Sequence, residues 1–195
     1  MGKIFCLMGK SSTGKDTIYN ALFQKEINVK KIVPYTTRPI REGEEQGREY
    51  IFCDEAKVQE LENAKRIVEL RAYNTVYGVW KYFTVDDGQI DLTRDSYLLI
   101  GTLETYVKLK EYFGNDQVLP IYIEVEDGER LLRAIARERK QNAPKYEEMC
   151  RRFLADAEDF AEDKLQAAHV EKRFENIEIA ETIERVAEYI RRNTM

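Results

Sequence analysis

Two glycines and a lysine near the N-terminus have the spacing of a phosphate-binding loop. Gly9, Gly14 and Lys15 in the stretch MGKSSTGKDT fit the pattern G-x-x-x-x-G-K. Glycine allows backbone conformations that aim several N–H groups at one anion, and the lysine adds a mobile positive charge for the β- and γ-phosphates of a nucleotide. The loop also carries hydroxyl groups that can contact phosphate, on Ser11, Ser12, Thr13 and Thr17.

The residue after the lysine departs from the usual form of such a loop. Asp16 stands where a Ser or Thr hydroxyl normally completes the coordination shell of Mg²⁺. Because a carboxylate can also ligate Mg²⁺, directly or through water, our hypothesis is that Asp16 helps to place Mg²⁺ while Thr17 contacts phosphate. The alternative is that Asp16 is only a first-turn residue favoured by the helix dipole.

A second group of residues suited to phosphate lies in the stretch PYTTRPIREGEEQGREYIF, residues 34–52. It brings Arg38, Arg41 and Arg48 into one loop with Tyr50. A guanidinium is a planar cation with several N–H donors, so this set could clamp a phosphomonoester. The alternative is a charge run that only contacts solvent.

These residues need a strand and a helix to position them. Residues 3–8 form an apolar run that ends at the first glycine, and residues 17–23 resume with helical spacing, which predicts a strand, a loop and a helix. Residues 97–100 and 119–125 are continuous apolar runs typical of strands buried on both faces, each followed by a helical pattern. This alternation predicts an α/β fold with a doubly wound parallel sheet.

The remaining pattern predicts shorter elements. We expect strands at 30–33, 50–53, 67–73 and 76–85, a helix at 55–64 capped by Asp54, two charged helices separated by a break at 142–144, and a last amphipathic helix at 177–192. Proline cannot continue a helix, which is why Pro144 predicts the break. The middle of the chain is therefore expected to be a small β-rich insert.

The composition excludes some classes of function. With 195 residues, a net charge of −5 and a pI near 5.2, the chain does not have the basic excess that polymeric nucleic acids or membrane surfaces select. No window reaches the ~18 consecutive apolar residues of a membrane-spanning helix, and the N-terminal segment is unlike a secretory signal. We therefore expect a cytoplasmic protein whose anion sites are local basic pockets.

The cysteines and the single histidine carry no recognisable chemistry. Cys6, Cys53 and Cys150 are odd in number and lie far apart, so we interpret them as buried thiols rather than as disulfides or zinc ligands. His169 lies outside every candidate site segment, and we interpret it as structural or exposed.

The segment TTRPIREGEEQGREYIF resembles the nucleoside-monophosphate-binding segment of guanylate kinases, T-T-R-x-x-R-x-G-E-x-x-G-x-x-Y-x-F, at every fixed position. With the upstream phosphate loop, the resemblance covers essentially the whole chain. It implies that ATP binds residues 9–17 and that Arg38, Arg41 and Tyr50 bind the phosphate of the acceptor GMP, with Glu44 supporting the arginines.

The same resemblance suggests residues that read guanine. RIVELRAY resembles the family segment whose glutamate accepts from guanine N1–H and the exocyclic amine, which points to Glu69; the alternative is an exposed strand glutamate. Tyr77 resembles a tyrosine that reaches the acceptor phosphate. Two positions differ from the family: Val79 replaces a hydroxyl that touches guanine O6, and the sequence IGT, ending in Thr102, replaces an aspartate-rich D-x-D. We retain Thr102 as a GMP-binding candidate.

The charged helices around Pro144 resemble the family lid, whose arginines stabilise charge during phosphoryl transfer. Our candidates are Arg137, Arg139 and Arg152, with Arg133 and Arg151 as equally possible neighbours. Each of these arginines could instead lie on a solvated helix face. Asn176 falls where the family places an asparagine near adenine, although a helix cap explains it nearly as well.

Taken together, the resemblance implies one guanylate-kinase-like domain over residues 1–195, with a P-loop NTPase-type core (1–33, 96–127 and 165–195), an NMP-binding region (34–90) and a helical lid (128–164). The implied enzyme transfers phosphate from ATP, with Mg²⁺, to GMP or dGMP, as a monomer or homodimer. Its partners would be small nucleotides, with no nucleic acid polymer and no membrane. The alternatives are a kinase of the same fold for another phosphorylated acceptor, or a non-catalytic interaction module. No general base is expected.

Overall fold

A computed structural model describes residues 1–75 and 78–194 of the chain. Within these residues the larger sheet has five strands, all parallel, in the order β2-β7-β1-β8-β9. Its strands are β1 (Ile4–Met8), β2 (Lys30–Lys31), β7 (Tyr97–Ile100), β8 (Val118–Glu124) and β9 (Arg173–Glu175). The helices on its two faces are α1 (Lys15–Leu22), α3 (Leu103–Phe113), α6 (Glu162–Ala167) and α7 (Ile179–Thr194). This confirms the predicted α/β fold.

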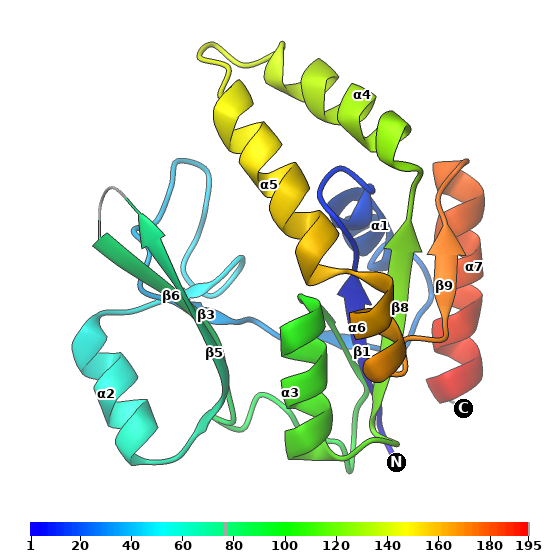
Figure 1. The fold of residues 1–195 in the computed structure, drawn as a ribbon. Helices are drawn as coiled ribbons and strands as arrows, with labels where there is room; N and C mark the ends of the chain where they lie inside the picture. The colour runs from blue at the N-terminus through cyan, green and yellow to red at the C-terminus, as the bar shows by residue number, and fades with distance from the viewer. Residues whose placement is uncertain (76–77, 195) are drawn as a thin grey trace.

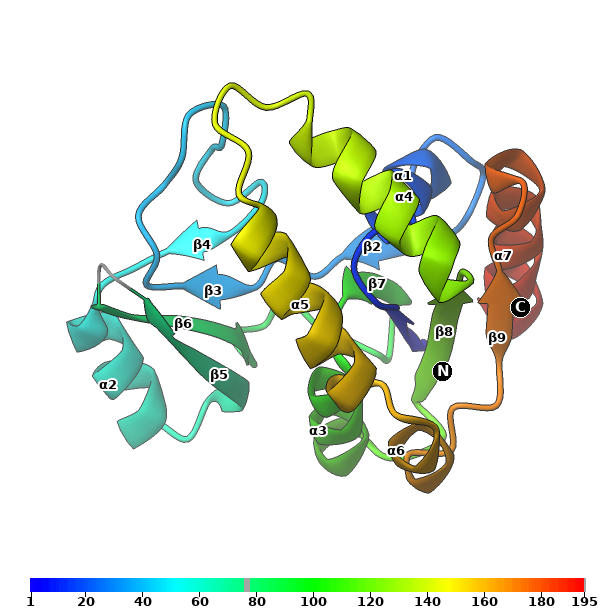
Figure 2. The same ribbon diagram turned by 45° about the horizontal axis from the view of Figure 1, so that its top comes forward.

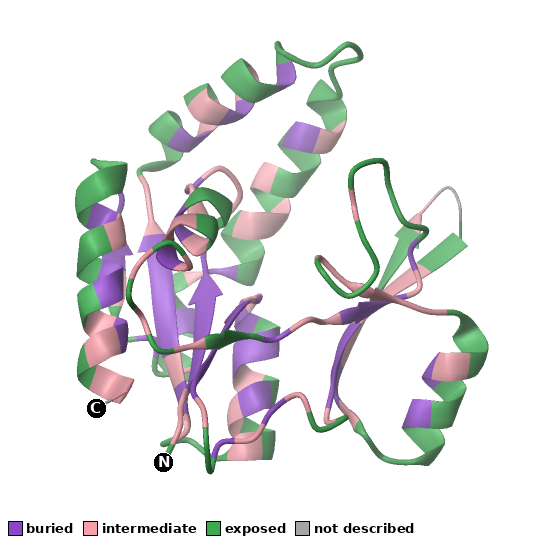
Figure 3. Cartoon of the chain, turned by 180° about the vertical axis from the view of Figure 1, so that it is seen from behind, coloured by how far each residue is buried: buried purple, intermediate pink, exposed green. Residues whose placement is uncertain are grey.

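The central strand of this sheet is buried on both faces. Ile4, Cys6 and Met8 pack into one cluster with α3 and α6, whereas Phe5 and Leu7 pack into another with α1 and α7. Successive side chains of a strand point to opposite faces, so a continuous apolar run is what a sheet covered on both sides requires. Figure 3 shows β1 and β8 as buried along most of their length.

A second, smaller sheet lies beside the first, in the order β4-β3-β6-β5, and Figure 1 shows α2 on its outer side. Its elements are β3 (Tyr35–Thr36), β4 (Ile51–Phe52), α2 (Glu55–Asn63), β5 (Ile67–Thr75) and β6 (Gly78–Val85). The predicted cap of α2 is confirmed, because the Asp54 side chain accepts from Lys57 N at 2.8 Å.

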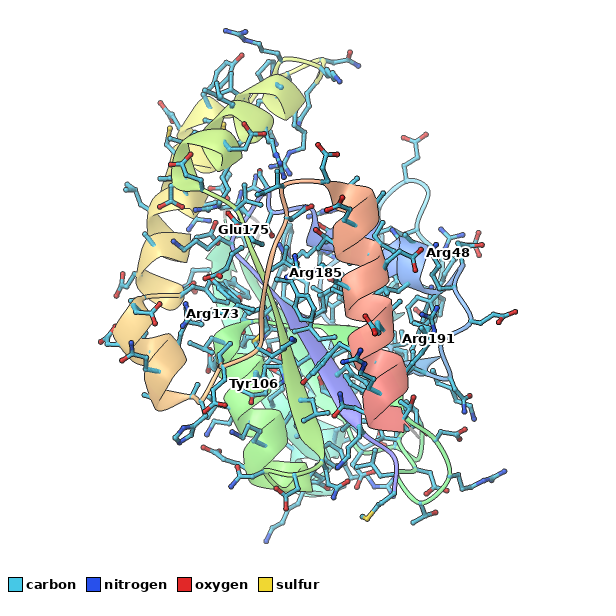
Figure 4. All side chains as sticks on the ribbon, turned by 90° about the vertical axis from the view of Figure 1, so that its right-hand side faces the viewer. Arg48, Tyr106, Arg173, Glu175, Arg185 and Arg191 are labelled. Carbon is cyan, nitrogen blue, oxygen red and sulfur yellow. The ribbon has the colours of Figure 1, made fainter. Side chains whose placement is uncertain are left out.

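Two long helices, α4 (Asp127–Glu138) and α5 (Tyr146–Asp159), form a hairpin whose turn contains Pro144. In Figures 1 and 2, α5 runs between the smaller sheet and the N-terminal loop and then leads into α6. Figure 4 shows β9, with Arg173 and Glu175, between α7 and the α5–α6 segment. Arg173 ties these parts together by pairing with Glu162 of α6 at 2.7 Å and with Glu124 of β8 at 3.2 Å.

Most predicted elements are present within two residues of their expected ends, but three were not foreseen. The strand β3 lies in a stretch expected to be a loop, α6 lies in a stretch expected to continue the preceding helix, and β9 lies where no strand is predicted. The prediction of three buried thiols is wrong: Cys6 is buried, but Cys53 is half-buried and Cys150 is exposed on the polar side of α5. Among the described helices, none combines the length and the apolar composition that a bilayer crossing requires.

Candidate nucleotide-binding site

The phosphate loop leaves β1 at Met8 and enters α1 at Lys15. Gly14 precedes the helix with a φ of 86°, in the left-handed region where residues with a Cβ are strained. A Cβ at Gly14 would also lie 2.8 Å from the side-chain nitrogen of Asn176. That nitrogen donates to Thr13 O at 2.8 Å. Asn176, a buried residue that directly follows β9, therefore holds the backbone of the loop in place.

The hairpin of α4 and α5 is bonded directly to the other end of this loop. Ser11 N donates to Asp156 Oδ2 of α5 at 2.7 Å, while Arg130 of α4 donates from Nε to Ser11 O at 3.0 Å. Arg130 also pairs with Asp156 at 3.0 Å and with Asp127, and it is only 1% exposed. Neither Arg130 nor Asp156 is predicted from the sequence, because nothing in their spacing separates them from the many other charges of these helices.

Two of the predicted lid arginines lie against the loop. Arg137 and Arg152 line a small cavity of about 10 Å³ together with Ser11 and Ser12, and Arg130 also contributes to its wall. A cavity of this size is about the smallest that can hold one water molecule. The Ser12 hydroxyl is buried there, and among the described residues it has no hydrogen-bond partner.

The other candidate arginines do not line this cavity. Arg139 caps the C-terminal end of α4 and is exposed, Arg133 pairs with Glu129 at 2.8 Å, and Arg151 pairs with Glu148 at 2.7 Å. We therefore place Arg137 and Arg152, but not Arg139, beside the phosphate loop.

The lysine of the loop lies among charged groups whose arrangement favours the binding of an anion. Burial lowers the pKa of Lys15, and the nearby carboxylates of Asp16 and Asp156 partly oppose that shift while Arg137 and Arg130 add to it. A site that already holds several positive groups stabilises polyphosphate, since the ligand supplies the missing negative charge.

The residues around Lys15 fit a metal that is held mainly by substrate. Asp16 is exposed in the first turn of α1, next to the hydroxyl of Thr17. Over residues 1–75 and 78–194, no group of three or more His, Cys, Asp or Glu side chains could enclose a metal ion. Mg²⁺ bound with a nucleotide takes one or two protein ligands and completes its shell with phosphate and water, which is the donor set that this loop offers.

The predicted acceptor clamp is built around Arg38, which is 3% exposed. Its two terminal nitrogens donate to the two carboxylate oxygens of Glu44 at 2.8 and 3.0 Å, and Glu44 also accepts from Arg41 N at 2.8 Å. The guanidinium stacks on the rings of Tyr50 and Phe52, with 5.4 and 5.5 Å to the centroids. Glu44 thus fixes both the side chain of Arg38 and the backbone of Arg41.

This arrangement sets the charge states of the clamp. The bond from Arg38 lowers the pKa of Glu44. Burial, the largest single influence, would lower the pKa of Arg38, but the hydrogen bond and the charge of Glu44 together with Tyr82 more than offset it, so that the pKa is raised. Burial also raises the pKa of Tyr50, which keeps its hydroxyl protonated and able to donate to an anion.

Three further candidates for the clamp have different outcomes. Arg48 is not part of it, contrary to expectation, because its exposed side chain pairs with Glu45 at 2.7 Å and with Glu49 at 2.5 Å. Tyr77 lies outside the described residues. The side chain of Arg41 is exposed at the loop surface.

The predicted base-reading glutamate is not exposed. Glu69 is 4% exposed on β5, where it accepts from Thr84 Oγ1 at 2.9 Å and from Arg71 Nε at 3.1 Å. This excludes the alternative of an exposed strand glutamate. Val79, by contrast, is 48% exposed on β6.

Thr102 caps α3, with its hydroxyl accepting from Thr105 N at 3.2 Å. It lines a cavity of about 590 Å³ between β5, α3 and α6, within the size range of small-molecule sites. Tyr73 of β5 and Lys164 of α6 are on other walls of this cavity. The walls of this cavity therefore come from both the smaller sheet and the helices that cover the larger sheet.

Comparison with known proteins gives a consistent result. The family model described as guanylate kinase matches residues 1–193. A guanylate kinase of Syntrophomonas wolfei is 30% identical over 122 residues, which are 62% of this chain and 61% of that protein. One of Caldanaerobacter subterraneus subsp. tengcongensis is 29% identical over 159 residues, 81% of this chain and 73% of that protein.

Other matches are shorter, and one structure matches throughout. The chain spans 36% of the length of a guanylate kinase of Rhodopseudomonas palustris, with 37% identity over 78 residues. The crystal structure of guanylate kinase from Anaplasma phagocytophilum superposes with a TM-score of 0.65 and 25% identity, covering 100% of this chain and 87% of that one.

Proposed function

This chain belongs to the guanylate kinase family, and from that premise we propose that it transfers the γ-phosphoryl group of ATP to GMP or dGMP, giving ADP and GDP or dGDP. The observation that carries the proposal is the cavity at the phosphate loop, where Arg137 and Arg152 of the hairpin meet Ser11 and Ser12. Guanidinium groups delivered to a polyphosphate loop are suited to stabilise charge on a migrating phosphoryl group.

Each part of the reaction has candidate residues in this chain. On the donor side, the amides and hydroxyls of residues 9–17 bind the phosphates of ATP, Lys15 neutralises the β- and γ-phosphates, and Asn176 supports the loop on the side of the adenine. On the acceptor side, Arg38, Arg41, Tyr50 and Tyr77 hold the phosphate of GMP, and Glu44 keeps the two arginines in place. Arg137 and Arg152 then approach the transferred group, and no general base is needed, because positioning and electrostatics supply most of the rate.

The divalent metal of the family enters with ATP. We assign it as Mg²⁺, with Asp16 as the ligand from the protein, directly or through water, and Thr17 in contact with phosphate. When bound, the metal neutralises phosphate charge. The chain supplies few ligands of its own, in keeping with a metal that arrives with its nucleotide.

The acceptor base is read by Glu69 of β5, and Thr102, which lines the large cavity together with Tyr73 of the same strand, lies near the base. A buried carboxylate accepts from N1–H and the amine of guanine, whereas adenine would present its unprotonated N1 and a C2–H, neither of which donates a conventional hydrogen bond to the carboxylate. In this scheme residues 34–90 bind the monophosphate, residues 128–164 form the lid, and the remaining segments form the core.

The test is the formation of ADP, followed with ATP and a panel of acceptors: GMP, dGMP, IMP and AMP. The proposal expects GMP and dGMP to be the best acceptors, and Lys15→Met to lower turnover by roughly 100-fold, the order of effect seen when a charge-stabilising donor is removed. Lys25→Met is the matched control at the other end of α1, where the lysine pairs with Glu184. A preference for AMP, or ADP formation that needs no acceptor, contradicts the proposal.

A further inference from the structure

The two faces of the smaller sheet are chemically different. One face is apolar and is covered by α2, through Tyr35, Phe83, Val85, Val58 and Leu61. The opposite face carries three cross-strand pairs between β5 and β6, which are Glu69 with Thr84, Arg71 with Tyr82, and Tyr73 with Trp80. Residues directly opposite on paired strands share a face, so these polar and aromatic side chains form one surface.

This surface is continuous with the acceptor clamp. The ring of Tyr82 lies 5.7 Å from the ring of Tyr50, on which Arg38 stacks, and 5.7 Å from the ring of Tyr73. Tyr73 in turn lines the cavity of about 590 Å³. A monophosphate held at Arg38 and Tyr50 would therefore place its base over Glu69, Arg71 and Tyr73.

Arg71 is the cation of this surface. Its Nε donates to Glu69 Oε2 at 3.1 Å, and its side chain is 17% exposed, against 2% for that of Glu69. A guanidinium has five N–H donors, so a bond through Nε leaves the terminal nitrogens for other acceptors. The acceptor base thus meets a hydrogen-bond acceptor and a hydrogen-bond donor side by side.

A donor beside an acceptor is complementary to one edge of a 6-oxopurine. Guanine presents its N1–H donor next to the O6 acceptor, and a guanidinium is well suited to donate to purine O6. Adenine presents the reverse pattern, an amine donor next to an N1 acceptor, so both side chains would be mismatched. Of these two positions, a carboxylate alone would recognise only the N1–H of the purine and would leave the group at position 6 unread.

We propose that Arg71 is a specificity-determining residue, whose guanidinium donates to the 6-oxo group of the acceptor purine while Glu69 accepts from the adjacent N–H. The inference rests on the proposed function and extends it to a second base contact. The competing explanation is that Arg71 only offsets the buried charge of Glu69, as a structural ion pair would.

The two explanations separate in a comparison of GMP with 6-thio-GMP, which keeps N1–H and the amine but replaces O6 by a weak acceptor. We expect wild type to prefer GMP in kcat/KM by about tenfold, the order of one base contact, and Arg71→Lys to lose most of that preference. The ratio of GMP to IMP, which reports the 2-amino group, should stay unchanged in Arg71→Lys and fall in Glu69→Gln. Arg66→Lys, at an exposed position just before β5, is the matched control.

Each result decides between the explanations. If Arg71→Lys keeps the wild-type preference for GMP over 6-thio-GMP, Arg71 acts only as a counter-charge and the inference is overturned. Equal use of both nucleotides by wild type overturns it without any variant, so the test does not depend on the variant folding. If wild type phosphorylates no purine monophosphate, the proposed function itself fails, which is a different outcome.

Discussion

At the scale of single residues, two arginines of the proposed acceptor site are fixed by hydrogen bonds to neighbouring carboxylates. Arg38 is fixed by two bonds to Glu44, and Arg71 by its bond to Glu69. Fixed donors lose little entropy when an anion binds and need no rearrangement in the transition state. The carboxylates near these arginines are therefore part of how the arginines work.

The pairing of Arg38 with Glu44 makes stability depend on pH. The bond lowers the pKa of Glu44 from its usual 4.5, so its contribution to folding is fully present above pH 4.5 and is lost as pH falls through the folded-state pKa. We expect the difference in unfolding free energy between wild type and Glu44→Gln to shrink as pH falls below 4.5, in urea titrations at several pH values. Glu42→Gln, exposed in the same loop, is the matched control. A pH-independent difference for Glu44→Gln would refute this assignment.

A second prediction for a single residue concerns Asp16. If this carboxylate helps to hold Mg²⁺, Asp16→Ala should need roughly ten times more Mg²⁺ for half-maximal ADP formation, since one of few protein ligands is lost. The measurement is a Mg²⁺ titration at fixed free ATP, with Asp54→Ala at the cap of α2 as the control. An unchanged titration would leave Asp16 as a first-turn residue favoured by the helix dipole.

At the scale of elements, α5 offers neighbouring arginines with different surroundings. Arg152 lines the cavity at the phosphate loop, whereas Arg151 points to solvent with 66% of its side chain exposed, and both pair with Glu148. We expect Arg152→Ala to lower kcat by roughly 100-fold and Arg151→Ala by less than about threefold. Equal effects in a steady-state assay would show that helix charge, rather than position, matters.

The base of the same hairpin should contribute to stability through Asp156. Asp156→Ala removes one of the two carboxylates that pair with Arg130, which is 1% exposed, and it also removes the acceptor of Ser11 N. We expect Asp156→Ala to lower the free energy of unfolding by about 3 kcal/mol, measured by urea denaturation. Glu129→Ala, which breaks a surface pair with Arg133 on α4, should cost about 0.5 kcal/mol or less. Similar losses for both variants would show that Asp156 contributes no more than a partner in a surface ion pair.

At the scale of the whole molecule, the sequence predicts those strands that local apolar patterns determine, and it does not predict strands that depend on distant partners. The strands β1, β7 and β8 were predicted almost to the residue, since a parallel sheet covered on both faces needs continuous apolar runs. The short strands β3 and β9 carry no such run, and they form only because β6 and β8 provide partners.

The same limit applies to the site. The phosphate loop and Arg38 lie in motifs with fixed spacing, so the sequence predicts them. The residues that the sequence does not single out depend on the folded chain. Arg130 and Asp156 have partners that are 119 and 145 residues away in the sequence. Arg71 has its partner only 2 residues away, but folding creates the buried surroundings that distinguish it. Charged residues in helices and strands are usually solvated, so spacing alone could not distinguish these residues from their neighbours.

The arrangement of the whole molecule predicts that one ligand should engage both nucleotide sites at once. The hairpin is bonded to the phosphate loop through Arg130 and Asp156, and α5 lies between that loop and the smaller sheet. Adenosine and guanosine joined by a five-phosphate bridge should therefore bind across both sites. At a concentration 100 times its Kd it should raise the free energy of unfolding by about 2.7 kcal/mol, measured by thermal or urea denaturation.

The analogue with adenosine at both ends is the control for base recognition, because it keeps the phosphates and loses the guanine edge. We expect it to stabilise the protein less at the same concentration, since Glu69 and Arg71 would both face mismatched groups. Lys15→Met should weaken both analogues equally, because the phosphate loop is common to them. If the two analogues stabilise wild type to the same extent, the smaller sheet does not read the base, and the assignment of guanine to this chain would have to be abandoned.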